Sequence, residues 1–245
     1  MNKSNKNKIF IILISLLTMI TITLSVLLVV EHRKVNGFKE MSYYEQKVYS
    51  YGVQNANLSK EQIVFIGDSI TDLYPLDSYY SDLNYATYNR GIGGDTTTGL
   101  KERLEVSAYD LNPKVIVMLI GLNDIIGGRT VNDVILTYHE IVKDIREKLP
   151  NTKLYCMSTL SLNKEILSSL EHLDEINEQV IVLNSSIKEW STQYDFTYLD
   201  LYSLVTDEYG YFDKQYTDDG IHLNKNGFIV WTNLLKPHLL SYLSN

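Results

Sequence analysis

Four stretches of the chain carry residue types that could together perform nucleophilic catalysis. In the first, Ser69 follows the apolar run Ile63–Ile66, which is typical of a short strand buried on both faces. A serine at the carboxyl end of a buried strand lies where open α/β sheets bind their ligands. Asp68 and Ser69 are also favoured helix caps, so this stretch alone does not separate a nucleophile from a cap. The other three stretches favour the nucleophile.

A carboxylate and an imidazole stand three residues apart near the carboxyl terminus, at Asp219 and His222. In a turn, this spacing can bring the carboxylate to one imidazole nitrogen and leave the other nitrogen to take a proton from a serine. The residue types also suit a zinc ion, but no second histidine or cysteine is placed to complete such a site. The pair therefore predicts a general base with its orienting acid.

A glycine-rich stretch contains three glycines in four positions, Gly91, Gly93 and Gly94. Glycines let the backbone approach a ligand closely, and a helix that begins near Asp95 would offer free N–H groups to an anion. A phosphate loop is the rival interpretation, but the Gly-Lys-Ser/Thr signature is missing. An ordinary glycine turn into a helix also fits the pattern. The anion site and the plain turn both stay open at this point.

Asn123 and Asp124 follow the apolar run Val115–Ile120, again at the carboxyl edge of a predicted buried strand. The amide of Asn123 can donate a hydrogen bond to an oxyanion, whereas an ionised Asp124 cannot. Asn and Asp are also common in turns, so a plain turn is the alternative.

Strand-like runs alternate with amphipathic helical patterns from residue 62 onward, which predicts an α/β fold. We expect a three-layer sandwich, in which helices cover both faces of a five-stranded parallel sheet. The predicted strands are Ile63–Ile66, Ala86–Asn89, Val115–Ile120, Lys153–Ser158 and Phe196–Leu201. The predicted helices are Asp95–Ser107, Val131–Leu149, Leu173–Tyr194 and Lys225–Leu243, with a short helix and a loop in residues 41–60.

The order and spacing of these motifs resemble the SGNH hydrolases, also called the GDSL esterase/lipase family. The motifs that carry the resemblance are Gly67-Asp68-Ser69, Gly94-Asp95, Gly121-x-Asn123-Asp124 and Asp219-x-x-His222. The likeness extends from about Tyr43 to Leu240. Two further stretches are similar to the bacterial branch that resembles platelet-activating-factor acetylhydrolase catalytic subunits, namely Asn89-Arg90-Gly91-Ile92 and His222-Leu223-Asn224…Gly227-Phe228…Trp231.

The resemblance implies the flavodoxin-like SGNH fold and the mechanism of a serine esterase. Ser69 would be the nucleophile, His222 the general base and then acid, and Asp219 the group that orients the imidazole and stabilises its cation. The oxyanion hole would combine the backbone N–H groups of Ser69 and Gly94 with the side-chain amide of Asn123. This chemistry needs no metal and no organic cofactor.

One segment departs from the family pattern. Relatives often continue the fourth strand into Ser-x-Leu-Pro-x-Asn, whereas this chain has Ser158-Thr159-Leu160-Ser161-Leu162-Asn163. The missing proline leaves the shape of this loop, and with it the acyl or alcohol specificity, unpredicted.

The amino-terminal part differs in character from the rest. Residues 1–8 form a basic tail, and residues 9–30 are 22 positions without charge, glycine or proline. Such a run is long enough to cross a bilayer core of about 30 Å as a helix. A cleavable signal peptide has a shorter apolar core, of about 7–15 residues, and ends in small residues that are missing here. We therefore expect a single-pass membrane anchor at residues 9–30, a juxtamembrane helix and linker at residues 31–60, and the hydrolase domain at residues 61–245.

Charge bears on orientation and on partners. Lysines before the span favour an inside amino terminus and an extracytoplasmic catalytic domain, although basic residues after the span weaken the asymmetry. The chain has a formal net charge of −8, and residues 1–40 carry +4, so residues 41–245 carry −12. An acidic domain argues against nucleic acid as a partner.

Together these inferences favour a membrane-anchored serine esterase that removes small acyl groups, acetyl foremost, from a carbohydrate of the cell surface or its surroundings. The substrate rests on family analogy, on the anchor and on the absence of a long apolar lid segment for a fatty chain. Three alternatives stay open: a lysophospholipase or thioesterase acting on lipid esters, an acetyltransferase using the same acyl-enzyme, and a non-catalytic carbohydrate-binding module. The sequence indicates no oligomeric state.

Overall fold

The computed structural model describes residues 16, 17, 19–21, 23–28, 30, 31, 35 and 41–244. The chain divides into two compact units, residues up to Gln46 and residues from Lys47 onward. In the first unit the described residues between 16 and 35 are helical, and their large apolar side chains are exposed. Among the described residues, no helix combines the length and apolar character needed to span a membrane, and the predicted anchor at residues 9–30 lies partly outside them.

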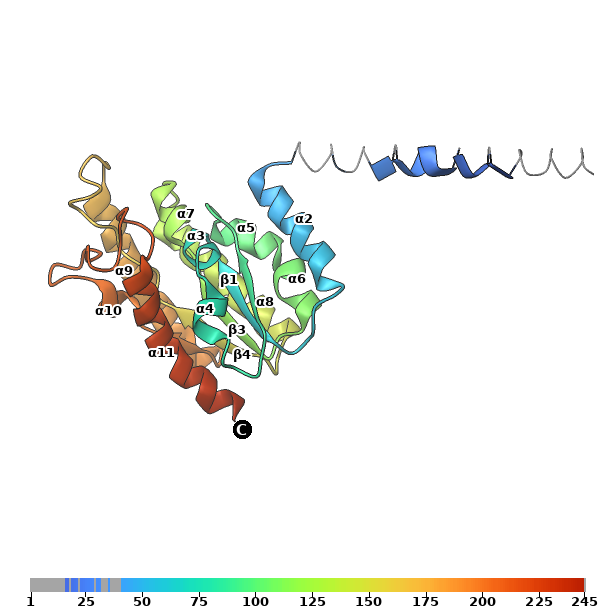
Figure 1. The fold of residues 1–245 in the computed structure, drawn as a ribbon. Helices are drawn as coiled ribbons and strands as arrows, with labels where there is room; N and C mark the ends of the chain where they lie inside the picture. The colour runs from blue at the N-terminus through green and yellow to red at the C-terminus, as the bar shows by residue number, and fades with distance from the viewer. Residues whose placement is uncertain are drawn as a thin grey trace, which may run out of the picture. The chain divides into compact units, whose positions relative to one another are not determined.

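A five-stranded parallel sheet forms the centre of the second unit (Figure 1). The two central strands that flank the site, β1 and β3, are buried along their whole length, as expected for strands covered on both faces. The predicted parallel α/β architecture is confirmed, and the strand ends differ from the predicted ends by no more than two residues. The strands are β1 (Ile63–Gly67), β2 (Thr87–Gly91), β3 (Val115–Leu119), β4 (Lys153–Met157) and β5 (Thr197–Leu199), in the spatial order β2-β1-β3-β4-β5.

Helices cover both faces of this sheet (Figure 1). The predicted helix Asp95–Ser107 is two short helices, because Arg103 leaves the helical conformation and turns its guanidinium into the core. The helices are α2 (Tyr43–Asn55), α3 (Ser69–Asp72), α4 (Leu76–Tyr80), α5 (Thr97–Glu102), α6 (Leu104–Ser107), the 3-10 helix η1 (Tyr109–Leu111), α7 (Leu122–Ile126), α8 (Val131–Lys148), α9 (Leu173–Gln193), α10 (Tyr202–Val205) and α11 (Lys225–Leu243).

An aromatic cluster fixes α11 against the segment that follows β1. The ring of Tyr74, between α3 and α4, stacks on Phe228 of α11 with centroids 4.8 Å apart and an interplanar angle of 11°. The Tyr74 hydroxyl shares a hydrogen bond of 2.6 Å with Thr232, so the polar end of the ring is satisfied as well. Because α3 begins at Ser69 and α11 begins shortly after His222, this packing brings together two side chains 153 residues apart in sequence.

The segment Ser158–Asn163, whose shape could not be predicted, is irregular but buried. Two asparagines of α9 hold its backbone. The amide of Asn184 accepts from the Thr159 N–H and donates to the Thr159 carbonyl, both at 2.8 Å. Asn177 bonds the N–H and the carbonyl of Leu162 in the same way, at 2.7 and 3.1 Å. The two amides lie seven residues apart on one face of α9 and satisfy the buried backbone as a neighbouring strand would.

Gly91, the last residue of β2, allows α3 to pack directly on the strand. A Cβ atom there would lie 2.2 Å from the backbone nitrogen of Asp72 and 2.7 Å from the carbonyl carbon of Thr71. Gly91→Ala must push α3 away from β2, and we expect it to lower the free energy of unfolding by about 1–3 kcal/mol, as overpacking of a core does. Urea unfolding of the full chain measures the effect.

Gly52→Ala is the matched control for this substitution. A Cβ atom at Gly52 of α2 would meet only Val106 Cγ1, at an ordinary 3.7 Å. Because alanine favours a helix over glycine by about 1 kcal/mol, this variant should be as stable as the wild type or more stable. Equal unfolding free energies for the two variants would contradict the close packing of α3 on β2.

Candidate active site

Ser69, His222 and Asp219, predicted as the reacting set, form one hydrogen-bonded line. The Oγ of Ser69 lies 2.8 Å from Nε2 of His222, and Nδ1 of His222 lies 2.6 Å from Oδ2 of Asp219. The second carboxylate oxygen, Oδ1, accepts hydrogen bonds from the backbone N–H groups of Ile221 and His222, at 2.9 and 2.8 Å. An imidazole oriented by an acid against a hydroxyl is the arrangement that can remove the hydroxyl proton.

The Asp219 carboxylate is held in its ionised form. Partial burial raises its pKa, but the hydrogen bonds from the His222 N–H and imidazole and from the Ile221 N–H outweigh burial and lower the pKa to about 2. The negative charge is therefore present at neutral pH, where it can stabilise a protonated imidazole.

Three strands end at the same level next to Ser69. The last paired residues are Gly67 of β1, Gly91 of β2 and Leu119 of β3, which lie side by side in the sheet. The segments that follow these strands carry Ser69 and the other two residues expected in the oxyanion hole. Parallel strands that end in register thus bring residues from three distant parts of the sequence to one edge.

The groups expected in the oxyanion hole have donors to spare. In the described part of the chain, neither the Ser69 N–H nor the Gly94 N–H donates to another protein group. Gly94 has a φ of +76°, and a Cβ atom there would meet nothing within 4 Å, so the loop is open on this side. The amide of Asn123 donates one N–H to the carbonyl of Asp95 at 2.9 Å, and an amide carries two. Such donors can stabilise the negative charge that develops on a bound carbonyl oxygen.

A buried arginine, which sequence reasoning missed, joins the ends of β1 and β2. Arg103 donates to the carbonyl of Gly67 at 2.9 Å, to the carbonyl of Arg90 at 2.7 Å and to Oδ2 of Asp95 at 2.7 Å. The side chains of this ion pair are only 1% and 2% exposed. Burial raises the pKa of Asp95, and the Arg103 guanidinium opposes that rise. The ion pair therefore fixes the residue that follows Gly94.

Asp124 ties the end of β3 to the start of α5. Its carboxylate accepts from the N–H of Thr97 at 2.8 Å and from the Thr97 hydroxyl at 2.7 Å, and it pairs with Arg129. Thr97 is the first residue of α5, where the N–H has no partner within the helix. Asp124 thus braces the glycine-rich loop, while its neighbour Asn123 supplies the side-chain amide expected in the oxyanion hole.

Asp68 is buried beside the serine. Its Oδ1 accepts from the Ile70 N–H at 3.0 Å, whereas Oδ2 has no hydrogen-bond partner in the described part of the chain. Burial raises the pKa of Asp68 to about 7, against the Ile70 hydrogen bond and with help from the nearby carboxylates of Asp95 and Asp124.

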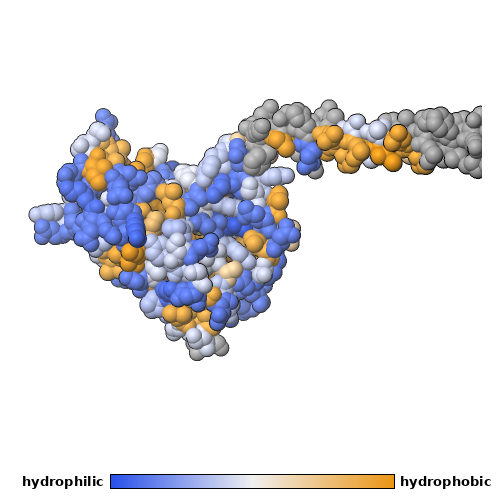
Figure 2. Space-filling model, viewed as in Figure 1, coloured by the Kyte–Doolittle hydropathy of each residue, from blue (hydrophilic) through white to orange (hydrophobic). Residues whose placement is uncertain are grey.

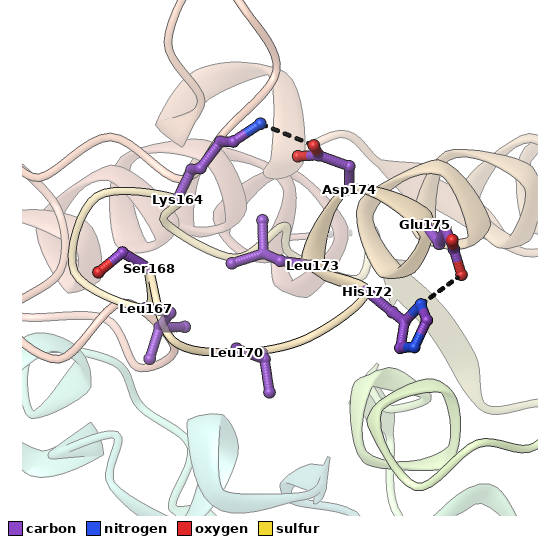
Figure 3. A pocket seen from close by; sticks show the side chains of 8 residues that line it. All are labelled: Lys164, Leu167, Ser168, Leu170, His172, Leu173, Asp174 and Glu175. Carbon is purple, nitrogen blue, oxygen red and sulfur yellow. Dashed lines mark hydrogen bonds and ion pairs between the residues drawn. The ribbon is translucent and has the colours of Figure 1, made fainter.

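A pocket of about 290 Å³ is built around the loop that leads into α9 (Figure 3). An ion pair of 2.6 Å between Lys164 and Asp174 closes one side of it, as Figure 3 shows. Leu167, from its wall, packs on Gly220, where a Cβ atom would lie 2.9 Å from Leu167 Cγ. The pocket thus adjoins the turn that carries Asp219, although its lining contains no residue of the Ser–His–Asp line. The lining residues are Lys164, Leu167, Ser168, Leu170, His172, Leu173, Asp174 and Glu175.

The model of the GDSL-like lipase/acylhydrolase family matches residues 65–228, which is more than half of the chain. The chain therefore belongs to this family, and it is a carboxylic ester hydrolase. The matched range contains every residue of the site described above.

Two solved structures agree with that assignment at the level of the fold, and one curated protein is similar in sequence. A solved structure from Streptococcus pneumonia, provisionally described as a platelet activating factor, is 27% identical with a TM-score of 0.72, covering 88% of this chain and 98% of its own. An acetylxylan esterase from Geobacillus stearothermophilus, solved as a catalytic mutant, is 18% identical with a TM-score of 0.56, covering 73% of this chain and 94% of its own. The N-acylneuraminate cytidylyltransferase of Escherichia coli O18:K1:H7 is 26% identical over 178 residues, and the match spans 71% of this chain but only 39% of that protein.

The buried ion pair predicts a large coupling between Arg103 and Asp95. Arg103→Leu leaves a buried carboxylate without its partner and is expected to lower the free energy of unfolding by about 3–5 kcal/mol. The double variant Arg103→Leu/Asp95→Asn should recover part of this loss, because no uncompensated charge remains. Urea unfolding of the wild type, the single variants Arg103→Leu and Asp95→Asn, and the double variant completes a double-mutant cycle. Strictly additive losses would contradict the pairing.

Asp68 predicts a pH dependence of stability. Its pKa is higher in the folded chain than in the unfolded chain, so the unfolded chain loses the proton first as pH rises. The unfolding free energy of the wild type should therefore fall relative to Asp68→Asn between about pH 4 and about pH 7, and level off above that. Urea unfolding of both chains from about pH 5 to about pH 8 measures the difference. A difference that does not change with pH would show that the carboxyl group is not buried as described.

Proposed function

We propose that the protein is a serine esterase that removes small acyl groups, acetyl foremost, from a carbohydrate at or near the cell surface. The observation that carries the proposal is the unbroken line of contacts from the Ser69 hydroxyl through His222 to the ionised Asp219. It supports nucleophilic catalysis by a serine, because the hydroxyl, the base and the orienting acid already stand within hydrogen-bond distance.

The proposed reaction has two half-reactions. Ser69 Oγ attacks the ester carbonyl carbon while Nε2 of His222 takes the hydroxyl proton, and the alcohol leaves with that proton. Water then attacks the acyl-enzyme with His222 again acting as base, which releases the acid and restores Ser69. Asp219 stays ionised throughout and stabilises the imidazolium that forms in each half-reaction.

The proposed oxyanion hole consists of the N–H groups of Ser69 and Gly94 and the amide of Asn123. One donor of this kind contributes about 3–4 kcal/mol to stabilisation of the transition state. The hydrogen bond from Asn123 to Asp95 supports this role, because it orients the amide before the substrate arrives and little reorganisation is left for the reaction.

Two observations support an acylated carbohydrate as substrate. One structural neighbour is an acetylxylan esterase. The face of the second unit seen in Figure 2 is mostly hydrophilic, with apolar residues in small separate groups. A fatty acyl chain would favour a broader apolar surface beside the site.

The proposed location is the cell membrane, with residues 9–30 as a single-pass anchor and the catalytic domain outside. The described part of that run supports an apolar environment, because side chains such as Leu17 and Leu28 are 63% and 71% exposed. The same observation favours a second candidate function, a lysophospholipase or thioesterase, since an anchored site would stand close to lipid esters.

Hydrolysis of p-nitrophenyl esters from acetate to palmitate by the full chain, beside Ser69→Ala, tests the proposal. We expect the rate to peak at short acyl chains and to vanish in the variant, because Ser69 supplies the attacking oxygen. A peak at long chains would move the function to lipid esters. If no ester gave a Ser69-dependent rate, the esterase would be ruled out. Labelling by a fluorophosphonate would then separate an acetyltransferase, which should react at Ser69, from a binding module, which should not.

A further inference from the structure

Helix α2 lies before the residues that the family model matches, yet one of its faces is bonded to residues 91–94 and their neighbours. We call residues 91–94 the proposed oxyanion loop, because they carry the Gly94 N–H. The family match begins at residue 65, whereas α2 spans Tyr43–Asn55. Lys47, Tyr51 and Asn55 are spaced four residues apart and so lie on one face of the helix. Tyr51 bonds the carbonyl of Gly91, and Asn55 accepts from Arg90, the residue before it. Lys47 bonds Asp72, which packs against Gly91.

Tyr51 holds the end of β2. Its hydroxyl donates to the carbonyl of Gly91 at 2.5 Å, and the side chain is buried, with 3% exposed. The guanidinium of Arg90 lies over the Tyr51 ring, 4.5 Å from its centroid. Burial raises the pKa of Tyr51, so the hydroxyl is protonated and able to donate at neutral pH.

Lys47 acts on the same loop through a carboxylate. Its ammonium pairs with Oδ1 of Asp72 at 2.7 Å, and Oδ2 of Asp72 accepts from the Gly93 N–H at 3.1 Å. Asp72 is the last residue of α3, the helix that begins with Ser69. One carboxylate therefore joins α2, the helix of the serine and the residue that precedes Gly94.

Asn55 anchors the far end of this helix face. It donates to the carbonyl of Val106 in α6 at 2.7 Å, and its oxygen accepts from the Arg90 guanidinium at 3.1 Å. The face of α2 is therefore attached at both ends, to α6 and to the proposed oxyanion loop, and it can resist movement of the loop.

We infer that Tyr51 and Lys47 are positioning residues that fix the peptide carrying the Gly94 N–H at the distance from Ser69 that an oxyanion requires. Three glycines in four positions give this stretch large conformational freedom, and the hydrogen bonds at Gly91 and Gly93 remove much of it. The inference rests on the proposed function, because it takes the Gly94 N–H as an oxyanion donor.

Kinetics of the full chain on p-nitrophenyl acetate test the inference. Tyr51→Phe and Lys47→Met should each lower kcat by about 10- to 100-fold while KM stays within about twofold, because misplaced donors weaken the transition state more than the bound ester. Asn123→Ala is the reference for a direct loss of a donor. Lys47→Arg should restore kcat, since it restores the cation beside Asp72. Val53→Ala is the control on the opposite side of α2, where the side chain is 55% exposed, and should leave kcat unchanged.

A boronic acid that binds Ser69 as a tetrahedral adduct gives a second readout, since its charged oxygen occupies the oxyanion hole. Its inhibition constant should rise in Tyr51→Phe and in Lys47→Met by about the factor by which kcat/KM falls. If Tyr51→Phe does not fold, the partly exposed Lys47 provides the deciding variant. A kcat and an inhibition constant within about twofold of the wild type in the folded variants, beside an impaired Asn123→Ala, would overturn the inference while leaving the esterase intact. If the wild type shows no Ser69-dependent hydrolysis, the proposed function fails first, and the inference fails with it.

Discussion

The geometry of this site depends on one buried guanidinium. At the carboxyl ends of β1 and β2 the chain leaves the sheet, and Arg103 donates there to the carbonyls of both Gly67 and Arg90. The Gly67 carbonyl also accepts from the Ile92 N–H at 3.1 Å. The same guanidinium neutralises Asp95, next to the proposed oxyanion donor. A neutral side chain could not serve three acceptors from two strands and a loop, because only arginine carries five donors on a rigid plane. The serine segment and the glycine-rich loop are thus held by the same group.

The sequence predicts the sheet and the motif-bearing turns well, because both are local signals. Apolar runs such as Val115–Ile120 are typical of central strands, and polar residues directly after them lie at the carboxyl edge in any parallel sheet. Arg103 could not be found in this way. Within a helical pattern an arginine is normally exposed, and its burial here depends on acceptors that become its neighbours only when the chain folds. The break between α5 and α6 has the same cause.

The same limit applies to the amino-terminal side of the domain. The loosely helical spacing in residues 41–60 predicts a short helix, and α2 is that helix. Its attachment to the site was not predictable, because the Tyr51 hydroxyl and the Gly91 carbonyl are 40 residues apart and Tyr51 belongs to no motif. The predicted domain start at residue 61 separates α2 from the site, whereas the compact unit of the structure begins at Lys47. Local patterns mark elements, but the contacts between them determine where a catalytic unit begins.

The two asparagine clamps of α9 have a consequence for how the family can diversify. Asn177 and Asn184 bind only main-chain atoms of the segment Ser158–Asn163, and so they do not discriminate among its side chains. The side chains of the segment are themselves buried, and those of Ser158, Thr159 and Asn163 make hydrogen bonds of their own. Exchange of residues here is therefore limited by the packing around each side chain, whereas the path of the segment is held by main-chain hydrogen bonds that any side chain would leave in place.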